Sequence, residues 1–279
     1  MILSSSLQAL KYQFTQNGWS WLRWLLCYTV ILYLIAPLII VVIISFSSGY
    51  YLTFPPPGFS FQWYENILDP KWMDTLWISV LVMVPTSIIA TALGLATALG
   101  LARSDIPGTT FIRALLISPL VVPVIITAAA LYGTFRSWGI HGTVGGLILA
   151  HIILTIPYAL STITASLGMV DARLEDAAAN LGASPWTVFR KITFPLVMPG
   201  VLSSFLFSLV ISFDELIVSL FISTPLVRPV TVQMWSNIRG DVDPTIAALA
   251  SMLFVFALLI LLLESLFGKK EQSQDASAS

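Results

Sequence analysis

Long apolar runs alternate with short polar segments along most of the chain. A membrane helix needs about 20 mostly apolar residues to cross the hydrocarbon layer of a bilayer. Six runs are long enough, over residues 24–44, 75–102, 114–135, 144–166, 199–222 and 244–263. The pattern therefore predicts an all-α polytopic membrane protein with six transmembrane helices.

The first run, which follows Arg23, has a second interpretation as a cleavable signal peptide. It is longer than the apolar core of such a peptide, and no small-x-small cleavage site follows closely. We therefore predict a transmembrane domain over residues 24–267. A cytoplasmic tail over residues 1–23 is expected before it, and a disordered cytoplasmic tail over residues 268–279 after it.

The polar segment after the first run has a stiff part and an aromatic part. Three consecutive prolines from Pro55 to Pro57 favour extended backbone. Residues 61–68 carry Trp63 and Tyr64, side chains that are suited to the headgroup level of a bilayer. We expect a short interfacial helix there.

Two of the apolar runs contain residues that bear on helix packing. Ala90, Gly94 and Ala98 recur every four positions in the second run and predict a close-packing face. Pro119 and Pro123 in the third run free backbone carbonyl groups within a membrane helix. They indicate either a packing kink or a gating element.

The composition excludes several classes of protein. Only 10% of the 279 residues are charged and 57% are hydrophobic, whereas a soluble domain has about 25% charged residues. The net charge of −1 argues against a nucleic-acid partner, which requires a basic patch.

The single cysteine, Cys27, excludes an internal disulfide and a cysteine metal cage. The two histidines disfavour a histidine metal site, and His151 is interpreted as a hydrogen-bonded polar residue rather than a ligand.

The distribution of basic residues predicts the orientation in the membrane. Segments that face the cytoplasm carry an excess of Lys and Arg. With six spans, the side that holds both termini carries nine basic residues: Lys11, Arg23, Arg103, Arg113, Arg173, Arg190, Lys191, Lys269 and Lys270. The other side carries four: Lys71, Arg136, Arg228 and Arg239. Both termini and residues 174–200 are therefore predicted to be cytoplasmic.

The polar segment between the fourth and fifth runs predicts a short helix. Asp171 is suited to its N-cap, and Glu175 and Asp176 place negative charge near its start, where the helix dipole favours it. The alanines from Ala177 to Ala179 are strong helix formers with little bulk. Such a small-faced helix is suited to a groove on another protein.

A turn and a second short helix are predicted next. Gly182 ends the first helix in a left-handed conformation that glycine adopts easily. Ser184 as N-cap and Pro185 at the first helical position begin the second helix. The segment is therefore expected to form a compact elbow.

This elbow resembles the cytoplasmic EAA loop of permease subunits of binding-protein-dependent ABC importers. The family pattern is Glu-Ala-Ala, three residues, Gly, nine residues and Ile-x-Leu-Pro. Its spacing is intact here in Asp176-Ala177-Ala178, Gly182 and Ile192-Thr193-Phe194-Pro195. Asp176 stands for the glutamate and Phe194 for the leucine, and the adjacent Glu175 leaves open which acid contacts a partner.

The resemblance implies a type I ABC importer permease fold with a cytoplasmic EAA coupling helix. Residues 167–197, called the coupling loop below, would then contact an ATPase. The implied contact residues are Glu175, Asp176, Ala177, Ala178 and Gly182.

Two acidic residues lie inside the fifth run, where charges are costly and are candidates for function. On a continuous helix Glu215 shares one stripe with four serines, and Asp214 lies about 100° away. The serines are Ser204, Ser208, Ser212 and Ser219. We predict a substrate path lined by Glu215, Asp214, Ser212 and Ser208, with Glu215 facing the path and Asp214 able to pair with a neighbouring helix or subunit instead. The alternative is that the serine stripe is a helix-packing seam.

A wider resemblance indicates the transported solute. Trp63-Tyr64 after the proline loop, Ser212-Phe213-Asp214-Glu215, and Asp-Pro-Thr-Ile-Ala-Ala at residues 243–248 resemble the polyamine (spermidine/putrescine) branch of these permeases. Two carboxylates beside a path suit a cationic solute. The resemblance implies inward transport of a polyamine across a bacterial inner membrane, and it leaves open another small solute, amino-acid-like or opine-like.

No phosphate-binding loop G-x-x-x-x-G-K-[ST] occurs in the sequence, which excludes ATP hydrolysis by that route in this chain. We expect no enzymatic activity and no cofactor in the chain itself. The resemblance implies two ATPase subunits that bind ATP and Mg, a second permease subunit and an external solute-binding protein. A different chain is expected for the second permease, and the sequence leaves open whether the permease pair is identical or different.

The sequence fits two other classes of membrane protein less well. A secondary transporter driven by an ion gradient through Asp214 and Glu215 often has inverted repeats, and none is visible in the sequence. A membrane-embedded enzyme would need a nucleophile–base pair or a metal cluster, and the sequence indicates neither.

Overall fold

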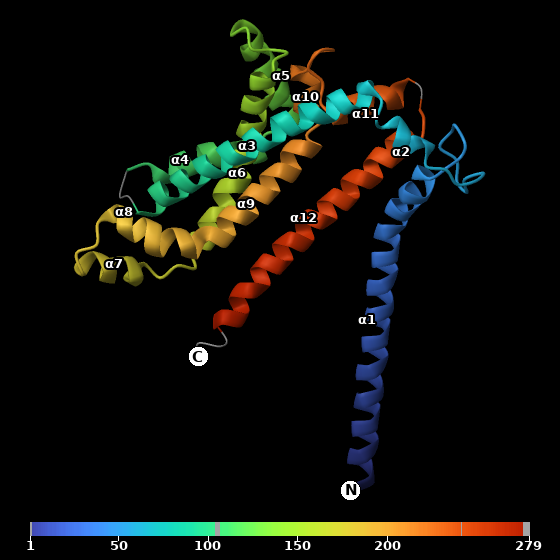
Figure 1. Cartoon of the computed structure of the whole chain (residues 1–279). Coiled ribbons are helices and arrows are strands. Elements are labelled where there is room, and N and C mark those ends of the chain that lie inside the picture. Colours follow the sequence, from blue (N-terminus) through green and yellow to red (C-terminus); the bar gives the residue numbers. More distant parts are fainter. Residues whose placement is uncertain (1, 104–106, 241, 276–279) are drawn as a thin grey trace. The chain divides into compact units, whose positions relative to one another are not determined.

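The computed structural model consists of helices joined by loops (Figure 1). It describes the backbone of residues 2–103, 107–240 and 242–275, and the side chains within these ranges from residue 20 to 259 and at residue 262. The elements are α1 (Ile2–Ser45), α2 (Gln62–Asn66), α3 (Pro70–Arg103), α4 (Thr109–Ile117), the 3-10 helix η1 (Ser118–Leu120), α5 (Val124–Ser137), α6 (Val144–Leu167), α7 (Ala172–Asn180), α8 (Pro185–Val188), the π-helix η2 (Phe189–Thr193), α9 (Phe194–Asp214), α10 (Ile217–Ile222), α11 (Val230–Arg239) and α12 (Thr245–Asp275). In these residues the only β-pairings are isolated bridges. The predicted all-α class is confirmed.

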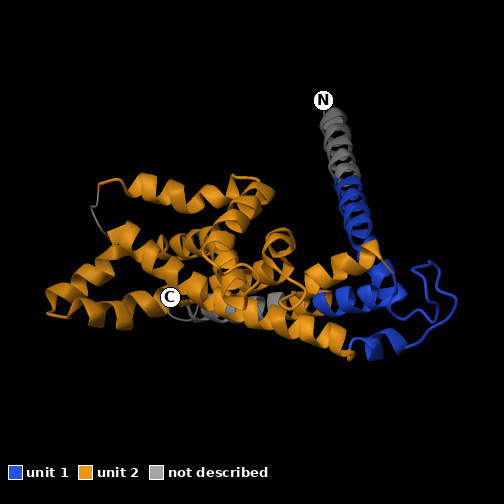
Figure 2. Cartoon of the chain, turned by 90° about the horizontal axis from the view of Figure 1, so that it is seen from above, with its two compact units in different colours: residues 1–67, 242–253 blue, residues 68–241, 254–279 orange. Residues whose placement is uncertain are grey.

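The chain divides into two compact units (Figure 2). One comprises residues 1–67 and 242–253, and the other comprises residues 68–241 and 254–279. All the candidate functional residues lie in the second unit.

Four helices in the described part of the chain are long and apolar enough to cross a membrane. They are Ser20–Ser45, Pro70–Arg103, Val144–Leu167 and Pro185–Asp214. The first, second and fourth predicted spans are therefore confirmed as helices of spanning length. The fifth differs, because its helix ends at Asp214 rather than continuing to residue 222.

The terminal segments are more helical than predicted. α1 begins at Ile2 and so runs through the expected tail over residues 1–23, of which residue 1 lies outside the described residues. α12 continues to Asp275, into the segment over residues 268–279 that we expected to be disordered, and residues 276–279 lie outside the described residues. The apolar part of α12 that is described in full, Thr245–Leu259, is shorter than a complete span, so the sixth span stays a prediction.

The third predicted span, over residues 114–135, is bent at the two prolines, and the bend is a break between two helices. α4 and η1 lead to a break, and α5 continues from it at an angle of 100°. Pro119 lies inside η1 and Pro123 is the N-cap of α5. The physical reason is that proline has no N–H to donate and disfavours a helical conformation in the residue before it. The described residues thus contain four candidate spans, or five if this bent pair is one span.

Helices α3, α6 and α9 pack against one another in the second unit (Figure 1). Ala90, Gly94 and Ala98 are buried on α3, as predicted for a close-packing face. A Cβ atom at Gly94 would lie 2.8 Å from the Cβ atom of Ala159 on α6. The absence of a side chain at Gly94 therefore permits the close approach of the two backbones.

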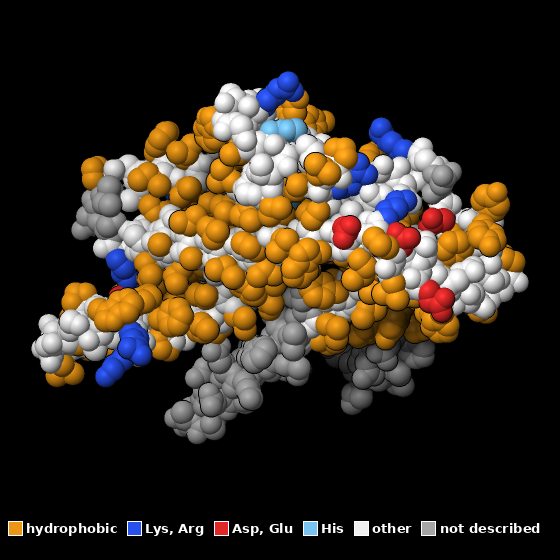
Figure 3. All heavy atoms as spheres, turned by 45° about the horizontal axis from the view of Figure 1, so that its top comes forward, with side chains coloured by type: hydrophobic (Ala, Val, Ile, Leu, Met, Phe, Trp, Pro, Cys, Tyr) orange, Lys and Arg blue, Asp and Glu red, His pale blue; other side chains and the backbone are white. Residues whose placement is uncertain are grey.

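Apolar side chains dominate the surface that Figure 3 displays, and charged groups are sparse on it. On α1 the large side chains of Trp24, Tyr33 and Leu34 are all more than 60% exposed. Exposed apolar surface of this extent is suited to lipid or to apolar partner chains rather than to water.

The first unit contains the predicted short helix, α2, after the proline loop. Its Trp63 is buried, and the indole Nε1–H donates to the carbonyl oxygen of Ser47 at 2.6 Å. The Tyr64 and Ser45 hydroxyls lie 2.7 Å apart. These aromatic side chains hold α2 against the end of α1, and Trp63 does not project outwards as a headgroup anchor would.

Candidate coupling loop and substrate pocket

The coupling loop has the capped elbow that the sequence predicts. The Asp171 side chain caps α7 by accepting the Arg173 N–H at 2.9 Å. Gly182 follows with a φ of +86°, a left-handed conformation that side-chain-bearing residues adopt at a cost. The Ser184 hydroxyl then accepts the Thr187 N–H at 3.3 Å at the start of α8. These local bonds explain why the elbow could be predicted from the sequence.

Glu175 and Asp176 have different surroundings. The Glu175 carboxylate accepts hydrogen bonds from Arg103, at the end of α3, and from the Thr193 hydroxyl in η2, each at 2.8 Å. The Glu175 side chain is 16% exposed, whereas Asp176 is exposed at the surface. Glu175 therefore ties α7 to two other elements of this chain, and Asp176 is the acid that is accessible to a partner.

The remaining residues of the predicted contact lie at or near the surface. Ala177 and Gly182 are exposed and Ala178 is half-buried. A Cβ atom built on Gly182 would have no heavy atom within 4 Å. Next to this surface is a cleft of about 380 Å³, lined by residues of α3, α7, α8 and η2 that include Arg103, Glu175 and Asp176.

The fifth predicted span breaks at the two acidic residues. α9 ends at Asp214, Glu215 has an extended conformation with φ −69° and ψ 104°, and α10 begins at Ile217. The Glu215 carboxylate accepts the backbone N–H of Val218 at 2.9 Å and so caps the start of α10. The prediction of a continuous helix over residues 199–222 is wrong, and the stripe derived from it does not extend past Ser212.

The serine stripe packs inside the chain. Ser204, Ser208 and Ser212 are all buried. The Ser204 hydroxyl lies 3.4 Å from that of Thr91 on α3, and the Ser212 hydroxyl lies 2.9 Å from Nδ1 of His151 on α6. Within this chain the serines form a helix-packing seam, which is the alternative that the sequence left open, and Ser208 and Ser212 do not line the pocket described next.

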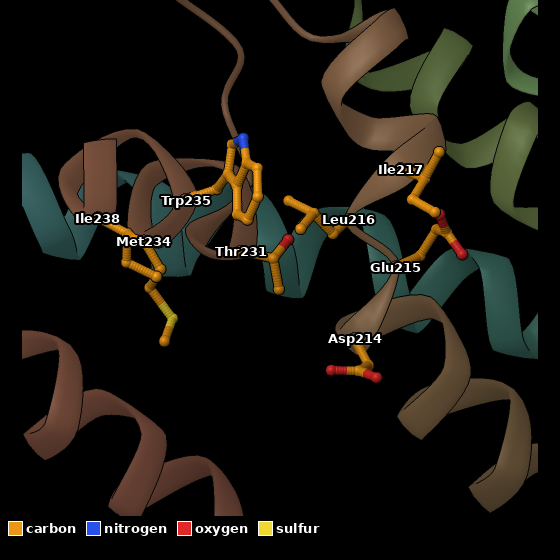
Figure 4. A pocket seen from close by; sticks show the side chains of 8 residues that line it. All are labelled: Asp214, Glu215, Leu216, Ile217, Thr231, Met234, Trp235 and Ile238. Atoms are coloured by element: carbon orange, nitrogen blue, oxygen red, sulfur yellow. The ribbon is translucent and has the colours of Figure 1, made fainter. Parts of the chain in front are cut away.

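Asp214 and Glu215 line a common pocket of about 480 Å³ (Figure 4). Its other lining residues come from the break, from α10 and from α11: Leu216, Ile217, Thr231, Met234, Trp235 and Ile238. The figure shows the two carboxylates pointing in different directions from adjacent positions of the backbone. The helical geometry predicted that the two acids face different neighbours, but the break brings both to one cavity.

Glu215 also lines a second cavity, of about 360 Å³. The wall of this cavity includes residues 119–124 at the break in the third span, together with Leu154, Tyr158 and Ile211. The breaks in the third and fifth spans therefore border the same cavity, and Glu215 is common to both pockets.

Sequence reasoning missed the aromatic members of these cavities as site residues. The guanidinium carbon of Arg239 lies 4.9 Å from the centre of the Trp235 ring, at cation–π distance. Trp235 is on α11 and Tyr158 is on α6, far from Glu215 in the sequence. No periodicity links the three positions, so only the tertiary structure brings them together.

Comparisons with known proteins find relatives along most of the chain. Residues 15–272 match the family described as binding-protein-dependent transport system inner membrane component. The chain is 34% identical over 245 residues to the spermidine/putrescine transport system permease protein PotC of Haemophilus influenzae, covering 87% of this chain and 95% of that protein. It is 31% identical over 229 residues to the putrescine transport system permease protein PotI of Escherichia coli, covering 79% of this chain and 81% of that protein.

Solved structures share the fold at lower identity. A bacterial ABC transporter involved in the import of the acidic polysaccharide alginate matches with a TM-score of 0.68 at 14% identity, over 90% of this chain and 96% of that one. An amino acid ABC transporter matches with a TM-score of 0.57 at 20% identity, over 74% of this chain and 97% of that one. The sequence matches cover far more than half of the chain, and the chain therefore belongs to the binding-protein-dependent transport system inner membrane components, the permease subunits of ABC importers.

Proposed function

We propose that this permease subunit forms part of the path by which an ATP-driven importer moves a small cationic solute inwards, and that the solute is a polyamine such as spermidine or putrescine. The observation that carries the proposal is the pocket at the break after α9, which is lined by Asp214, Glu215 and Trp235. Relatives whose names refer to spermidine and putrescine transport support the same solute class.

The chemistry of the pocket suits protonated amines. Two carboxylates offer charge-assisted hydrogen bonds to ammonium groups, and an indole face attracts a cation. Burying such acids in a membrane protein is costly unless they face water or a partner charge. Their position at a helix break beside a cavity is consistent with a role in passing a cation.

The coupling loop is the proposed contact with a separate ATPase. Asp176, Ala177 and Gly182 are exposed on the elbow, so we assign them the contact surface, while Glu175 holds the elbow to α3 through Arg103. In this proposal two ATPase subunits bind ATP and Mg on the cytoplasmic side. Closure of the two ATPase subunits on ATP moves the elbow. ATP thereby favours one conformation of the transmembrane domain over the other.

Transport by purified complexes in proteoliposomes tests this proposal. This chain, its ATPase and its second permease would be reconstituted with the external binding protein, and uptake of radiolabelled spermidine would be measured with ATP or with an imposed ion gradient. We expect uptake with ATP only, and competition by putrescine.

Two results would contradict the proposal. Uptake by this chain alone under an ion gradient would indicate a secondary transporter. ATP-dependent uptake of an amino acid that spermidine does not compete with would place the solute in another class.

A further inference from the structure

His151 is a buried polar side chain that the transport proposal does not use. It lies on α6, and its residue is 2% exposed. Its Nδ1 atom lies 2.9 Å from the Ser212 hydroxyl oxygen, and its Nε2 atom lies 3.0 Å from the Ser219 hydroxyl oxygen. A neutral imidazole has one donor and one acceptor, and a hydroxyl can serve as either, so both ring nitrogens are satisfied.

The two serines lie on opposite sides of the break in the fifth span. Ser212 belongs to α9 and Ser219 belongs to α10. The six residues between the two serines, from Phe213 to Val218, include neither proline nor glycine. No helix-breaking residue therefore accounts for the break, and contacts with other elements add to the local cap from Glu215.

α10 depends on such contacts for its position. It has six residues, which is too short for a helix to be stable by itself. Besides the cap from Glu215, its end is held where the Ile222 carbonyl oxygen accepts the Gly142 N–H at 3.0 Å. His141 Nε2 lies 3.1 Å from the Phe221 carbonyl oxygen. Of these contacts, the His151 ring is the one that joins α10 to α9.

We propose that His151 is a positioning residue that clamps α9 to α10 and thereby holds Asp214 and Glu215 in the pocket. Loss of the ring removes both bonds and leaves two buried hydroxyl groups without this partner, which favours another arrangement of the break. The consequence for transport rests on the proposed function, whereas the clamp itself is a statement about geometry.

Variants at His151 and Ser219 distinguish the loss of both hydrogen bonds from the loss of one. His151→Ala removes both bonds, and Ser219→Ala removes only the bond to α10. In His151→Asn the amide nitrogen replaces Nδ1 and can still bond to Ser212. In His151→Gln the amide nitrogen replaces Nε2 and can still bond to Ser219. Ser87→Ala is the matched control, because Ser87 is a buried serine whose hydroxyl donates to the Met83 carbonyl oxygen of its own helix, at 2.6 Å.

The first readout is independent of the substrate. In the full complex with Cys27→Ser, a Leu216→Cys substitution places a thiol in the break, where Leu216 lines the pocket. The rate at which this thiol reacts with a trimethylammonium methanethiosulfonate reagent reports how accessible the break is. We expect His151→Ala and Ser219→Ala to change this rate about fivefold or more, with Ser87→Ala unchanged.

The second readout is the uptake of spermidine. We expect the KM to rise about tenfold in His151→Ala with a smaller change in kcat, because the carboxylates are displaced rather than removed. We expect neither His151→Asn nor His151→Gln to restore the wild-type values, because a clamp needs both bonds.

The outcomes are distinguishable. An unchanged rate of thiol labelling in an assembled His151→Ala complex would overturn the clamp, and so would full rescue by a variant that retains one bond. If His151→Ala does not assemble, Ser219→Ala gives the same test with the imidazole retained. If the wild-type complex transports no polyamine but His151→Ala still alters the rate of labelling, the clamp stands and the proposed function is refuted.

Discussion

The carboxylate of Glu215 accepts the Val218 N–H at the start of α10 and lines both cavities beside the break. Asp214 is the last residue of α9 and lines only the first of the two. Adjacent acids thus differ in structural role although both face a cavity. The two roles of Glu215 can be separated, because a glutamine keeps an acceptor oxygen for the Val218 N–H but carries no charge.

The first prediction compares the two neutralised acids. Glu215→Gln is expected to raise the KM for polyamine uptake about tenfold, since it removes a charge-assisted contact that both cavities share. Asp214→Asn is expected to raise it less, about threefold, because Asp214 borders one cavity. Uptake kinetics in proteoliposomes measure both effects.

The matched control for these variants is Glu65→Gln, which removes an exposed carboxylate on α2 and should leave the KM unchanged. Normal transport by both pocket variants would show that the acids are not part of the path. A larger effect of Asp214→Asn would reverse the assignment of the two acids.

At the scale of the elements, the coupling loop combines local and long-range interactions. Its caps at Asp171 and Ser184 are local, but Glu175 reaches Arg103 on α3 and Thr193 on η2. An ion pair at such a partly exposed site contributes little to stability, on the order of 0–1 kcal/mol. Its value here is positional, because it links the elbow to the end of a long helix.

The second prediction concerns the glycine corner of this element. Gly182→Leu places a side chain on a left-handed residue at a cost of about 1–2 kcal/mol, in a position with open space around it. If the elbow sits in a groove on the ATPase, we expect the variant to lose most ATP-dependent uptake and to co-purify less ATPase.

Gly139→Leu is the control, because Gly139 has a φ of +71° and a Cβ atom built on it would likewise have no heavy atom within 4 Å. It carries a similar conformational cost away from the coupling loop, and uptake should be retained. Gly182→Leu with wild-type uptake and assembly would remove the basis for the coupling role.

At the scale of the whole molecule, the proposed orientation rests on the excess of basic residues on one side. The structure gives the helices of spanning length, while the side of the membrane on which each loop lies is a prediction from the charge rule. Leu181, in the coupling loop, and Trp138, after α5, are both well exposed and are predicted to lie on opposite sides.

The third prediction uses these two positions. In a Cys27→Ser background, we expect Leu181→Cys to react with a membrane-impermeant thiol reagent only in inside-out vesicles. Trp138→Cys should react only in right-side-out vesicles or intact cells, because its loop is predicted to be external. Labelling of both positions from one side would contradict the predicted topology.

The hydrophobic pattern alone was sufficient for α3, α6 and the apolar part of α1, and short-range signals were sufficient for the caps of the coupling loop. Apolar periodicity, Asp171, Gly182 and Ser184 act through neighbours within a few residues, so their effects can be inferred from the sequence. The family pattern from Asp176 to Pro195 was recognisable for the same reason, since its spacing is preserved along the chain.

The break at Glu215 was decided by the tertiary structure. Nothing between Ser212 and Ser219 is a helix breaker. The Glu215 cap on Val218 is local, but the bonds that join α9 to α10 come from His151, 61 and 68 positions away along the chain. Trp235 and Tyr158 are likewise outside any pattern around Glu215. A linear sequence displays neighbours along the chain, whereas this pocket is made by side chains that only the packing of α6, α9, α10 and α11 brings together.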